Sequence, residues 1–306
     1  MNIQKIKRRD YPFLLKQIRQ LTPDMDIIGT MPPDEYKFLC IVGSRTYSTY
    51  GKDACKKLIL GLRGYPIVIV SGLAVGIDSI AHEAALEAGL KTISFPGSGL
   101  DPSVLYPSSK RYLAEQIIKS GGALISRFNQ LQKSDIWTFP SRNRLMAGIS
   151  HATLVIEGRH GSGTLGTAKY AEEFNRDVLA VPGPIDSELS YGPHMLIRRG
   201  ATPITSSEDI LEALGFTDTT RYDDEKRVPK KHSRSNRSTQ LTINLDQISL
   251  SPDEKAICTL IKDESLSATE LIEKTSLPVS LFNITVTELE MKGFVSEEGG
   301  RYRMIR

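Results

Sequence analysis

The sequence contains little cysteine, and the cysteines it has are widely separated. Its three, Cys40, Cys55 and Cys258, form no Cys-x-x-Cys pair. We therefore expect reduced thiols inside the fold, and neither a disulfide framework nor a zinc site. The phosphate loop G-x-x-x-x-G-K-[ST] is also missing. The glycines of GSGTLG at 161–166 have the spacing G-x-G-x-x-G, but we do not interpret this turn as a dinucleotide-type turn. Binding of ATP or NAD gains little support, and we expect no metal and no cofactor.

Long apolar segments are absent as well. The sequence has no run of about 18 apolar residues, so we expect no transmembrane helix. The basic N-terminus MNIQKIKRRD is not followed by the apolar block of a signal peptide, so we expect none. A cytoplasmic protein without a membrane partner follows by elimination. The net charge of +3 is small, so charge alone does not indicate a nucleic-acid partner.

What the sequence does contain, between residues 37 and 215, is an alternation of apolar and amphipathic segments. Continuous apolar runs are typical of strands covered on both faces, and strand–helix alternation indicates a largely parallel sheet. We predict an α/β domain, doubly wound and Rossmann-like, whose ligand binds beyond the carboxyl ends of the strands. The predicted strands are 38–42, 66–71, 91–95, 121–126, 152–156, 177–181 and 201–204, and the predicted helices lie near 50–63, 77–88, 108–119, 141–149, 164–175, 191–199 and 207–214.

Two segments border this predicted domain of residues 37–215. Residues 1–36 form a lead-in with one short amphipathic helix, and we expect it to pack on the domain. Residues 216–250 lack apolar periodicity and are rich in charge and serine, so we predict a flexible linker. Its lysines and arginines could contact nucleic acid, although a solvated tether is the simpler interpretation.

Residues 251–306 predict a second, smaller domain. Ser251 and Ser267 each suit a helix N-cap, and Glu270 completes a capping box with Ser267. A third helix is expected over about 279–292, followed by a short hairpin, and this combination indicates a winged helix. The third helix has few base-reading side chains and carries two glutamates. Its composition favours a protein contact or dimerisation over binding of duplex DNA.

One stretch, residues 67–86, indicates how an anion would bind. A run of β-branched residues ends in Ser71-Gly72, a second glycine follows, and a helical pattern begins there. Such a turn directs backbone N–H groups and the positive end of a helix dipole to one point, which suits a phosphate. Residues 41–48 and 154–167 repeat the pattern, so we expect the three turns to converge on one anionic ligand.

Two of these turns carry further groups that suit a phosphate. Arg45 follows Ser44 after the first strand, and its guanidinium offers a bidentate fork. The last turn opens a helix with small side chains that expose N–H groups and hydroxyls to an anion. It consists of Gly161, Ser162, Gly163 and Thr164.

The segment FPSRNR, which begins at Phe139, combines an aromatic ring with cations. Arg142 and Arg144 flank Asn143 at the start of a predicted helix. Cations for phosphates together with an aromatic ring for base stacking are typical of sites for single-stranded nucleic acid. In the alternative interpretation, these arginines begin a helix and pair with acids such as Glu157.

Asp78 and His82 lie four residues apart, so they share one face of the predicted helix 77–88. A metal site or an acid–base pair is conceivable. We favour a structural pair beside the turn, with Asp78 capping the helix.

Together these stretches closely resemble the DNA-processing protein A family, also called DprA or Smf. The resemblance covers most of the chain, and several ordered motifs at the proper spacing make it specific. It is carried by VGSRTYSTYG (42–51), SGLAVGIDSIAHEAAL (71–86), GSGLDPSVLYP (97–107), FPSRNRLMAG (139–148), HGSGTLGTA (160–168), VPGPIDSELSYGPHMLIRRGA (181–201) and the C-terminal winged helix.

The resemblance implies an extended Rossmann-type fold that binds single-stranded DNA and works as a homodimer. It implies that the protein protects incoming DNA and loads the RecA recombinase in natural transformation and recombination. By motif matching, the residues implied for DNA binding are Ser44, Arg45, Ser71, Gly72, Phe139, Arg142, Asn143, Arg144 and the loop Gly161, Ser162, Gly163 and Thr164.

The chain departs from the family pattern after the strand at 121–126. Members usually read S-E-x-P there, whereas this chain has SRFN at residues 126–129. The loop at 127–137 is therefore expected to differ, and Arg127 and Lys133 could add phosphate contacts.

An enzyme is the main alternative. The same extended fold hosts nucleoside-monophosphate phosphoribohydrolases, whose signature resembles P-G-G-x-G-T-x-x-E. The two registers of this chain on that signature place Thr167 or Tyr170 at the glutamate position. The carboxylate needed to cleave an N-glycosidic bond is therefore missing, and we expect a non-catalytic DNA binder. A small-nucleotide sensor that uses the same pocket is a third interpretation.

Overall fold

The computed structural model describes residues 2–18, 24–216, 251–261, 266–275, 277–291, 294–298 and 301–304. The chain divides into two compact units, residues 1–228 and residues 229–306. Residues 217–250, nearly all of the predicted linker, lie outside the described residues.

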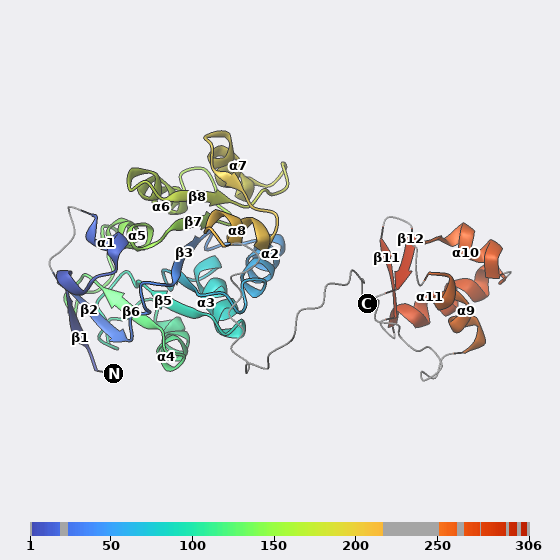
Figure 1. The fold of residues 1–306 in the computed structure, drawn as a ribbon, viewed down its shortest axis with the longest axis horizontal. Helices are drawn as coiled ribbons and strands as arrows, with labels where there is room; N and C mark the ends of the chain where they lie inside the picture. Colours follow the sequence, from blue (N-terminus) through green and yellow to red (C-terminus); the bar gives the residue numbers. More distant parts are fainter. Residues whose placement is uncertain are drawn as a thin grey trace, which may run out of the picture. The chain divides into compact units, whose positions relative to one another are not determined.

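The first unit is built on a nine-stranded sheet, most of which is parallel. In spatial order, its strands are β1 (Gln4–Lys7), β2 (Asp24–Gly29), β6 (Ala123–Ser126), β5 (Lys91–Ser94), β4 (Ile67–Ser71), β3 (Lys37–Val42), β7 (Ala152–Val155), β8 (Asp177–Ala180) and β9 (Thr202–Pro203) (Figure 1). β3 is the middle one of the seven strands from β6 to β9, with β4, β5 and β6 following outward on one side and β7, β8 and β9 on the other. The predicted doubly wound, Rossmann-like sheet is confirmed.

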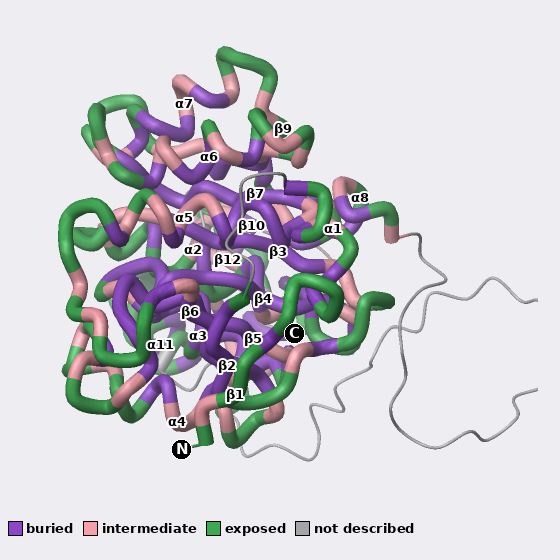
Figure 2. The backbone as a smooth tube through the Cα atoms, turned by 90° about the vertical axis from the view of Figure 1, so that its left-hand side faces the viewer, coloured by how far each residue is buried: buried purple, intermediate pink, exposed green. Residues whose placement is uncertain are grey.

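Helices cover both faces of this sheet, because successive residues of a strand point to opposite sides. In β3, Leu39 and Ile41 belong to one core cluster, whereas Phe38, Cys40 and Val42 belong to the other. Figure 2 shows the central strands buried along their length. The helices are α1 (Phe13–Lys16), α2 (Thr49–Leu60), α3 (Ile77–Glu87), α4 (Arg111–Lys119), α5 (Thr138–Ile149), α6 (Gly163–Glu173), α7 (Tyr191–Arg198) and α8 (Ser207–Ala213).

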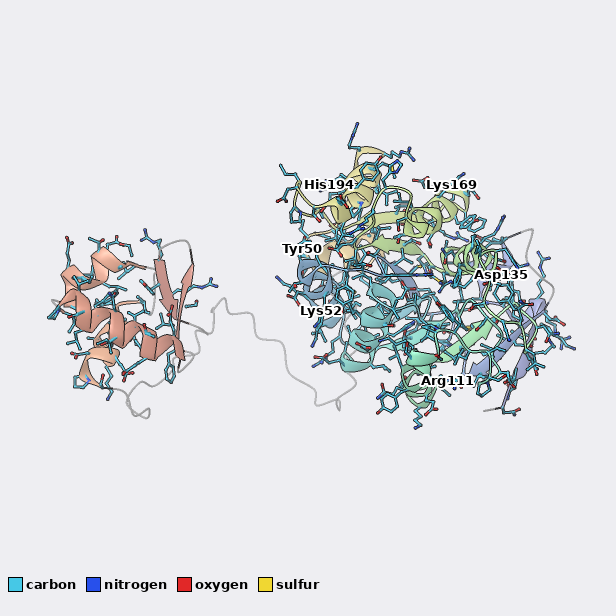
Figure 3. All side chains as sticks on the ribbon, turned by 180° about the vertical axis from the view of Figure 1, so that it is seen from behind. Tyr50, Lys52, Arg111, Asp135, Lys169 and His194 are labelled. Carbon is cyan, nitrogen blue, oxygen red and sulfur yellow. The ribbon has the colours of Figure 1, made fainter. Side chains whose placement is uncertain are left out.

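Each helix that shares a core cluster with side chains of β3 covers the face of the sheet on which those side chains lie. α2, α3 and α8 contribute to the cluster of Leu39 and Ile41, and α1, α5, α6 and α7 contribute to the cluster of Phe38. The loop after β8 is held from both sides. Tyr50 of α2 donates a hydrogen bond to the Pro182 carbonyl, and Nε2 of His194 on α7 lies 3.0 Å from the Gly183 carbonyl oxygen (Figure 3).

Residues 1–36 contribute β1 and β2, two strands that the sequence pattern does not predict. β1 pairs antiparallel with β2, and β2 pairs antiparallel with β6. Asp26 interrupts the apolar run of β2, yet its side chain is only 2% exposed. It accepts a 2.8 Å hydrogen bond from Nζ of Lys5 on β1. This cross-strand ion pair compensates the charge of the buried carboxylate through Oδ1, and a pattern of hydrophobicity cannot anticipate it.

The second unit has the helices and the hairpin predicted for a winged helix. Ser251 and Glu254 form a capping box at the first helix, and Ser267 and Glu270 exchange the same hydrogen bonds at the second. Among the described residues, no helix is both long and apolar enough to cross a membrane. The elements are α9 (Pro252–Leu260), β10 (Leu266–Ser267), α10 (Ala268–Thr275), α11 (Val279–Met291), β11 (Val295–Glu298) and β12 (Arg301–Met304).

Candidate functional site

A cavity of about 340 Å³ lies at the carboxyl ends of β3 and β7. These strands are parallel neighbours, but the chain after β3 leads to α2 on one face and the chain after β7 leads to α6 on the other. Loops that diverge in this way leave a crevice, which is where open α/β sheets bind ligands. The lining comprises Val42, Gly43, Ser44, Arg45, Thr46, Ala74, Asp78, Phe139, Arg142, Asn143, Arg159, Ser162, Gly163, Thr164 and Thr167.

The cavity brings together most of the predicted site residues from segments that are far apart in the sequence. Ser44, Arg45, Phe139, Arg142, Asn143, Ser162, Gly163 and Thr164 all line it. Ser71, Gly72, Arg144 and Gly161 lie outside the lining.

The turn after β4 braces the cavity. The Ser71 hydroxyl donates a 2.6 Å hydrogen bond to the carbonyl of Ile41, which ties β4 to β3. A Cβ atom on Gly72 would lie 1.4 Å from a guanidinium nitrogen of Arg142, so only glycine leaves room for that side chain. Gly76 has a φ of +90°, and a Cβ atom there would lie 2.4 Å from the carbonyl oxygen of Ser44. Ser71 and Gly72 therefore support residues that line the cavity without lining it themselves.

Arg45 is an exposed cation of the cavity. Its guanidinium carbon lies 5.1 Å from the centre of the Phe139 ring, within range of a cation–π contact. Within the part of the chain that the structure describes, no carboxylate forms an ion pair with Arg45. The guanidinium thus has the ring on one side and is otherwise exposed, so its fork of N–H groups is available to a phosphate.

Arg142 lines the cavity, but its side chain is almost entirely buried in the protein interior. Its NH1 group donates a 2.9 Å hydrogen bond to the carbonyl of Phe95 and lies 3.8 Å from Oδ2 of Asp78. The two charged side chains are only 6% and 9% exposed. Burial raises the pKa of Asp78, and the Arg142 charge opposes that rise, whereas burial lowers the pKa of Arg142. Arg142 therefore does pair with an acid, but the acid is Asp78 and not Glu157.

Arg144 points to a different neighbourhood. Its guanidinium lies over two rings, 5.8 Å from the centre of Tyr170 on α6 and 5.3 Å from the centre of Phe174, the C-cap of that helix. These contacts join α5 to α6 and leave Arg144 outside the lining of the cavity.

The start of α6 lines the cavity, and its hydroxyl groups form hydrogen bonds within the protein. Ser162 is the N-cap and accepts a 3.2 Å hydrogen bond from the backbone N–H of Thr164. The Thr164 hydroxyl in turn donates to the carbonyl of Gly43, at 3.2 Å, which joins the loops after β3 and β7. Asn143 donates to the carbonyl of Gly163 at 3.4 Å, which adds α5 to the same corner. Gly161 precedes this corner with a φ of +71°.

Arg159 is a cavity residue that sequence reasoning missed. It lies two residues before Gly161, in the loop after β7, and its Nε is 3.7 Å from Oε2 of Glu188. The two side chains are 59% and 82% exposed, so this ion pair is weak and readily exchanged for a phosphate. An arginine directly before a glycine-rich turn was the signal that could have identified it.

Two buried ionisable residues near the turns, Glu157 and His82, have structural roles. Glu157 is buried and accepts hydrogen bonds from the backbone N–H and the hydroxyl of Ser48, the N-cap of α2. Nδ1 of His82 lies 2.7 Å from the hydroxyl oxygen of Thr92, and burial lowers the pKa of His82 to about 3. Among the described residues, no group of three metal-ligating side chains comes together.

Two family models match the chain. The model for DNA recombination-mediator protein A matches residues 2–215, and the model for the DprA winged helix domain matches residues 245–301. Protein Smf of Synechocystis sp. is 33% identical over 96% of this chain and 78% of that protein. DNA processing protein DprA of Streptococcus pneumoniae is 38% identical over 67% of this chain and 72% of that protein.

Solved structures agree with these matches. DNA processing protein A from Streptococcus pneumoniae has a TM-score of 0.65 and 36% identity, over 71% of this chain and 75% of that chain. A structure that describes the single-stranded DNA binding mode of DNA processing protein A from Helicobacter pylori has a TM-score of 0.63 and 24% identity, over 70% of this chain and 96% of that chain. The chain belongs to the DNA recombination-mediator protein A family, also called DprA or Smf.

Proposed function

We propose that this protein binds single-stranded DNA without sequence preference and delivers it to a recombinase during recombination. The observation that carries the proposal is the lining of the cavity, where two exposed arginines, Arg45 and Arg159, meet the N-terminus of α6 and a phenylalanine ring at the carboxyl ends of β3 and β7. Cations and N–H groups hold phosphates, and aromatic rings stack bases of any identity.

The finer assignments rest on the family. A recombination mediator acts with a recombinase, so RecA is the proposed protein partner, and protection of incoming DNA in natural transformation is the proposed setting. A cytoplasmic homodimer is the form in which we expect the protein to act. The described part of α11 contains glutamates and no lysine or arginine, which supports a protein contact over duplex DNA for the winged helix.

A non-catalytic role is part of the proposal. Of the residues that line the cavity, Asp78 is the one carboxylate. Its side chain is buried and pairs with Arg142, so it is not free to face a ligand. Glu157 is occupied at the start of α2. A phosphoribohydrolase would need a carboxylate free to face the sugar. Incubation with AMP should therefore release no adenine, and robust release would replace the binding function with a hydrolytic one.

The direct test is replacement of Arg45 by Ala in the full chain. A hydrogen bond to a charged group contributes about 1.5–3 kcal/mol, so affinity for an oligothymidylate should fall roughly 10- to 150-fold. The plot of log affinity against log salt should lose about 0.7 of its slope for each phosphate contact removed. Fluorescence anisotropy with labelled oligonucleotides across a salt series measures both quantities.

Arg63→Ala is the matched control. Arg63 is exposed and follows α2, at the amino ends of the parallel strands, where it donates to the carbonyl of Glu87. Its loss should change neither affinity nor salt slope. Equal affinities of Arg45→Ala and the parent chain would show that the cavity is not the DNA site. Preference for a mononucleotide over an oligonucleotide would favour the sensor interpretation.

A further inference from the structure

Phe139 is the ring that the sequence pattern selects for base stacking, but its surroundings are already occupied. The Arg45 guanidinium lies over the ring, 5.1 Å from its centre. A Cβ atom on Gly97 would lie 2.7 Å from Cε1 of the ring, so the backbone of Gly97 packs directly against it. A base that stacked on Phe139 from the side of Arg45 would displace the guanidinium that the proposed function needs for phosphate.

A second aromatic ring lies beside this pair. The rings of Tyr106 and Phe139 have centres 6.0 Å apart and an angle of 61° between their planes, an edge-to-face arrangement. Tyr106 is 42% exposed, and in the described residues its ring contacts no aromatic ring other than Phe139. Arg45, Phe139 and Tyr106 thus form a continuous row that begins in the cavity and ends at the protein surface.

The backbone that carries Tyr106 is firmly held. The N–H of Tyr106 donates a 3.1 Å hydrogen bond to the hydroxyl of Ser98, which is fully buried. The Thr138 hydroxyl donates to the carbonyl of Gly97, and the Ser126 hydroxyl donates to the carbonyl of Ser98, both at 2.7 Å. The loop after β5 is therefore joined to β6 and α5, so the backbone that carries Tyr106 is held in place before any ligand arrives.

We propose that Tyr106 is a base-stacking residue of the DNA site, and that Phe139 positions the Arg45 guanidinium. This assignment rests on the proposed function and names the group that contacts the base. In this arrangement, Arg45 holds a phosphate while a neighbouring nucleotide places its base on the exposed ring of Tyr106. An aromatic face accepts any base, so the contact preserves binding without sequence preference.

The test uses the full chain and an oligothymidylate that carries 2-aminopurine at one position, moved along the strand. Stacking on a ring quenches 2-aminopurine fluorescence. Tyr106→Ala should weaken binding roughly 5- to 150-fold, the range that stacking of one base supplies, and should abolish the quenching at one position. Because no charge is removed, the salt slope should stay that of the parent. Tyr106→Phe should restore both affinity and quenching.

Tyr112→Ala is the matched control. Tyr112 lies on α4 and is 70% exposed. The Tyr112→Ala variant is expected to bind DNA with the affinity of the parent chain. If Tyr106 only supported Phe139 and Arg45, Tyr106→Ala would lower the salt slope as Arg45→Ala does, which would overturn the assignment. Unchanged affinity and quenching in Tyr106→Ala, with a parent chain that binds tightly, would overturn it as well. Failure of the parent to bind single strands would overturn the proposed function and this assignment together.

Discussion

Replacing Arg142 by Met is expected to destabilise the first unit and leave DNA affinity nearly unchanged, the reverse of Arg45→Ala. The Arg142 and Asp78 side chains are buried, with NH1 and Oδ2 3.8 Å apart. At an effective dielectric constant of about 20, Coulomb's law gives roughly 4 kcal/mol for unit charges at this separation. Loss of one partner from a buried ion pair typically costs about 3–5 kcal/mol, which agrees. We expect the free energy of unfolding to fall by about 4 kcal/mol.

The pH dependence gives an independent check on this cause. The Arg142 charge opposes the rise that burial produces in the pKa of Asp78, so the pKa should rise further when Arg142 is lost. The carboxyl then takes up a proton at a higher pH, and protonation removes the uncompensated buried charge. The difference in stability between parent and Arg142→Met should therefore shrink as pH falls. The double variant with Asp78→Asn should lose less than the sum of the single losses.

Urea unfolding measures these free energies conveniently, because the chain contains one tryptophan, Trp137, which lies in the first unit. Titrations followed by its fluorescence at neutral and mildly acidic pH compare the parent with each variant. If Arg142→Met is as stable as the parent and its DNA binding loses salt slope, Arg142 is a phosphate ligand and its structural role is refuted.

Two further predictions concern stability, one for glycines near the cavity and one for the buried His82. Gly72→Ala should cost on the order of 2 kcal/mol or more, because a Cβ atom would lie 1.4 Å from the Arg142 guanidinium, whereas Gly163→Ala, with no atom within 4 Å, should be nearly neutral in the same urea titration. Burial lowers the pKa of His82 to about 3 from its ordinary 6.5, so the unfolded chain binds this proton first as pH falls. Stability should therefore drop between about pH 6 and pH 4 by about 1.4 kcal/mol per pH unit from this group. His82→Gln should remove close to one proton from that slope, and an unchanged slope would contradict the assignment.

Much of the fold could be predicted because its signals are local. The apolar runs at 38–42 and 152–156 are long enough to identify β3 and β7 without any knowledge of their partners. Once strands alternate with helices, parallel pairing follows, and the turns after the strands must meet at one edge of the sheet. The capping box of Ser267 and Glu270 lies within four residues, so it too could be predicted from the sequence.

The different positions of Arg45 and Arg142 could not be predicted, because each follows small residues and looks suited to a phosphate. Arg142 turns inward because Gly72 leaves room for it and Asp78 offers a charge, and both lie more than sixty residues earlier in the chain. Tyr106 reaches Phe139 through a packed loop in the same way. The sequence by itself determined which segments form strands and helices and that their turns converge, since these are properties of short stretches. Only the tertiary structure decided which long side chains face the cavity and which are buried, because that choice depends on contacts between segments that are distant in the sequence.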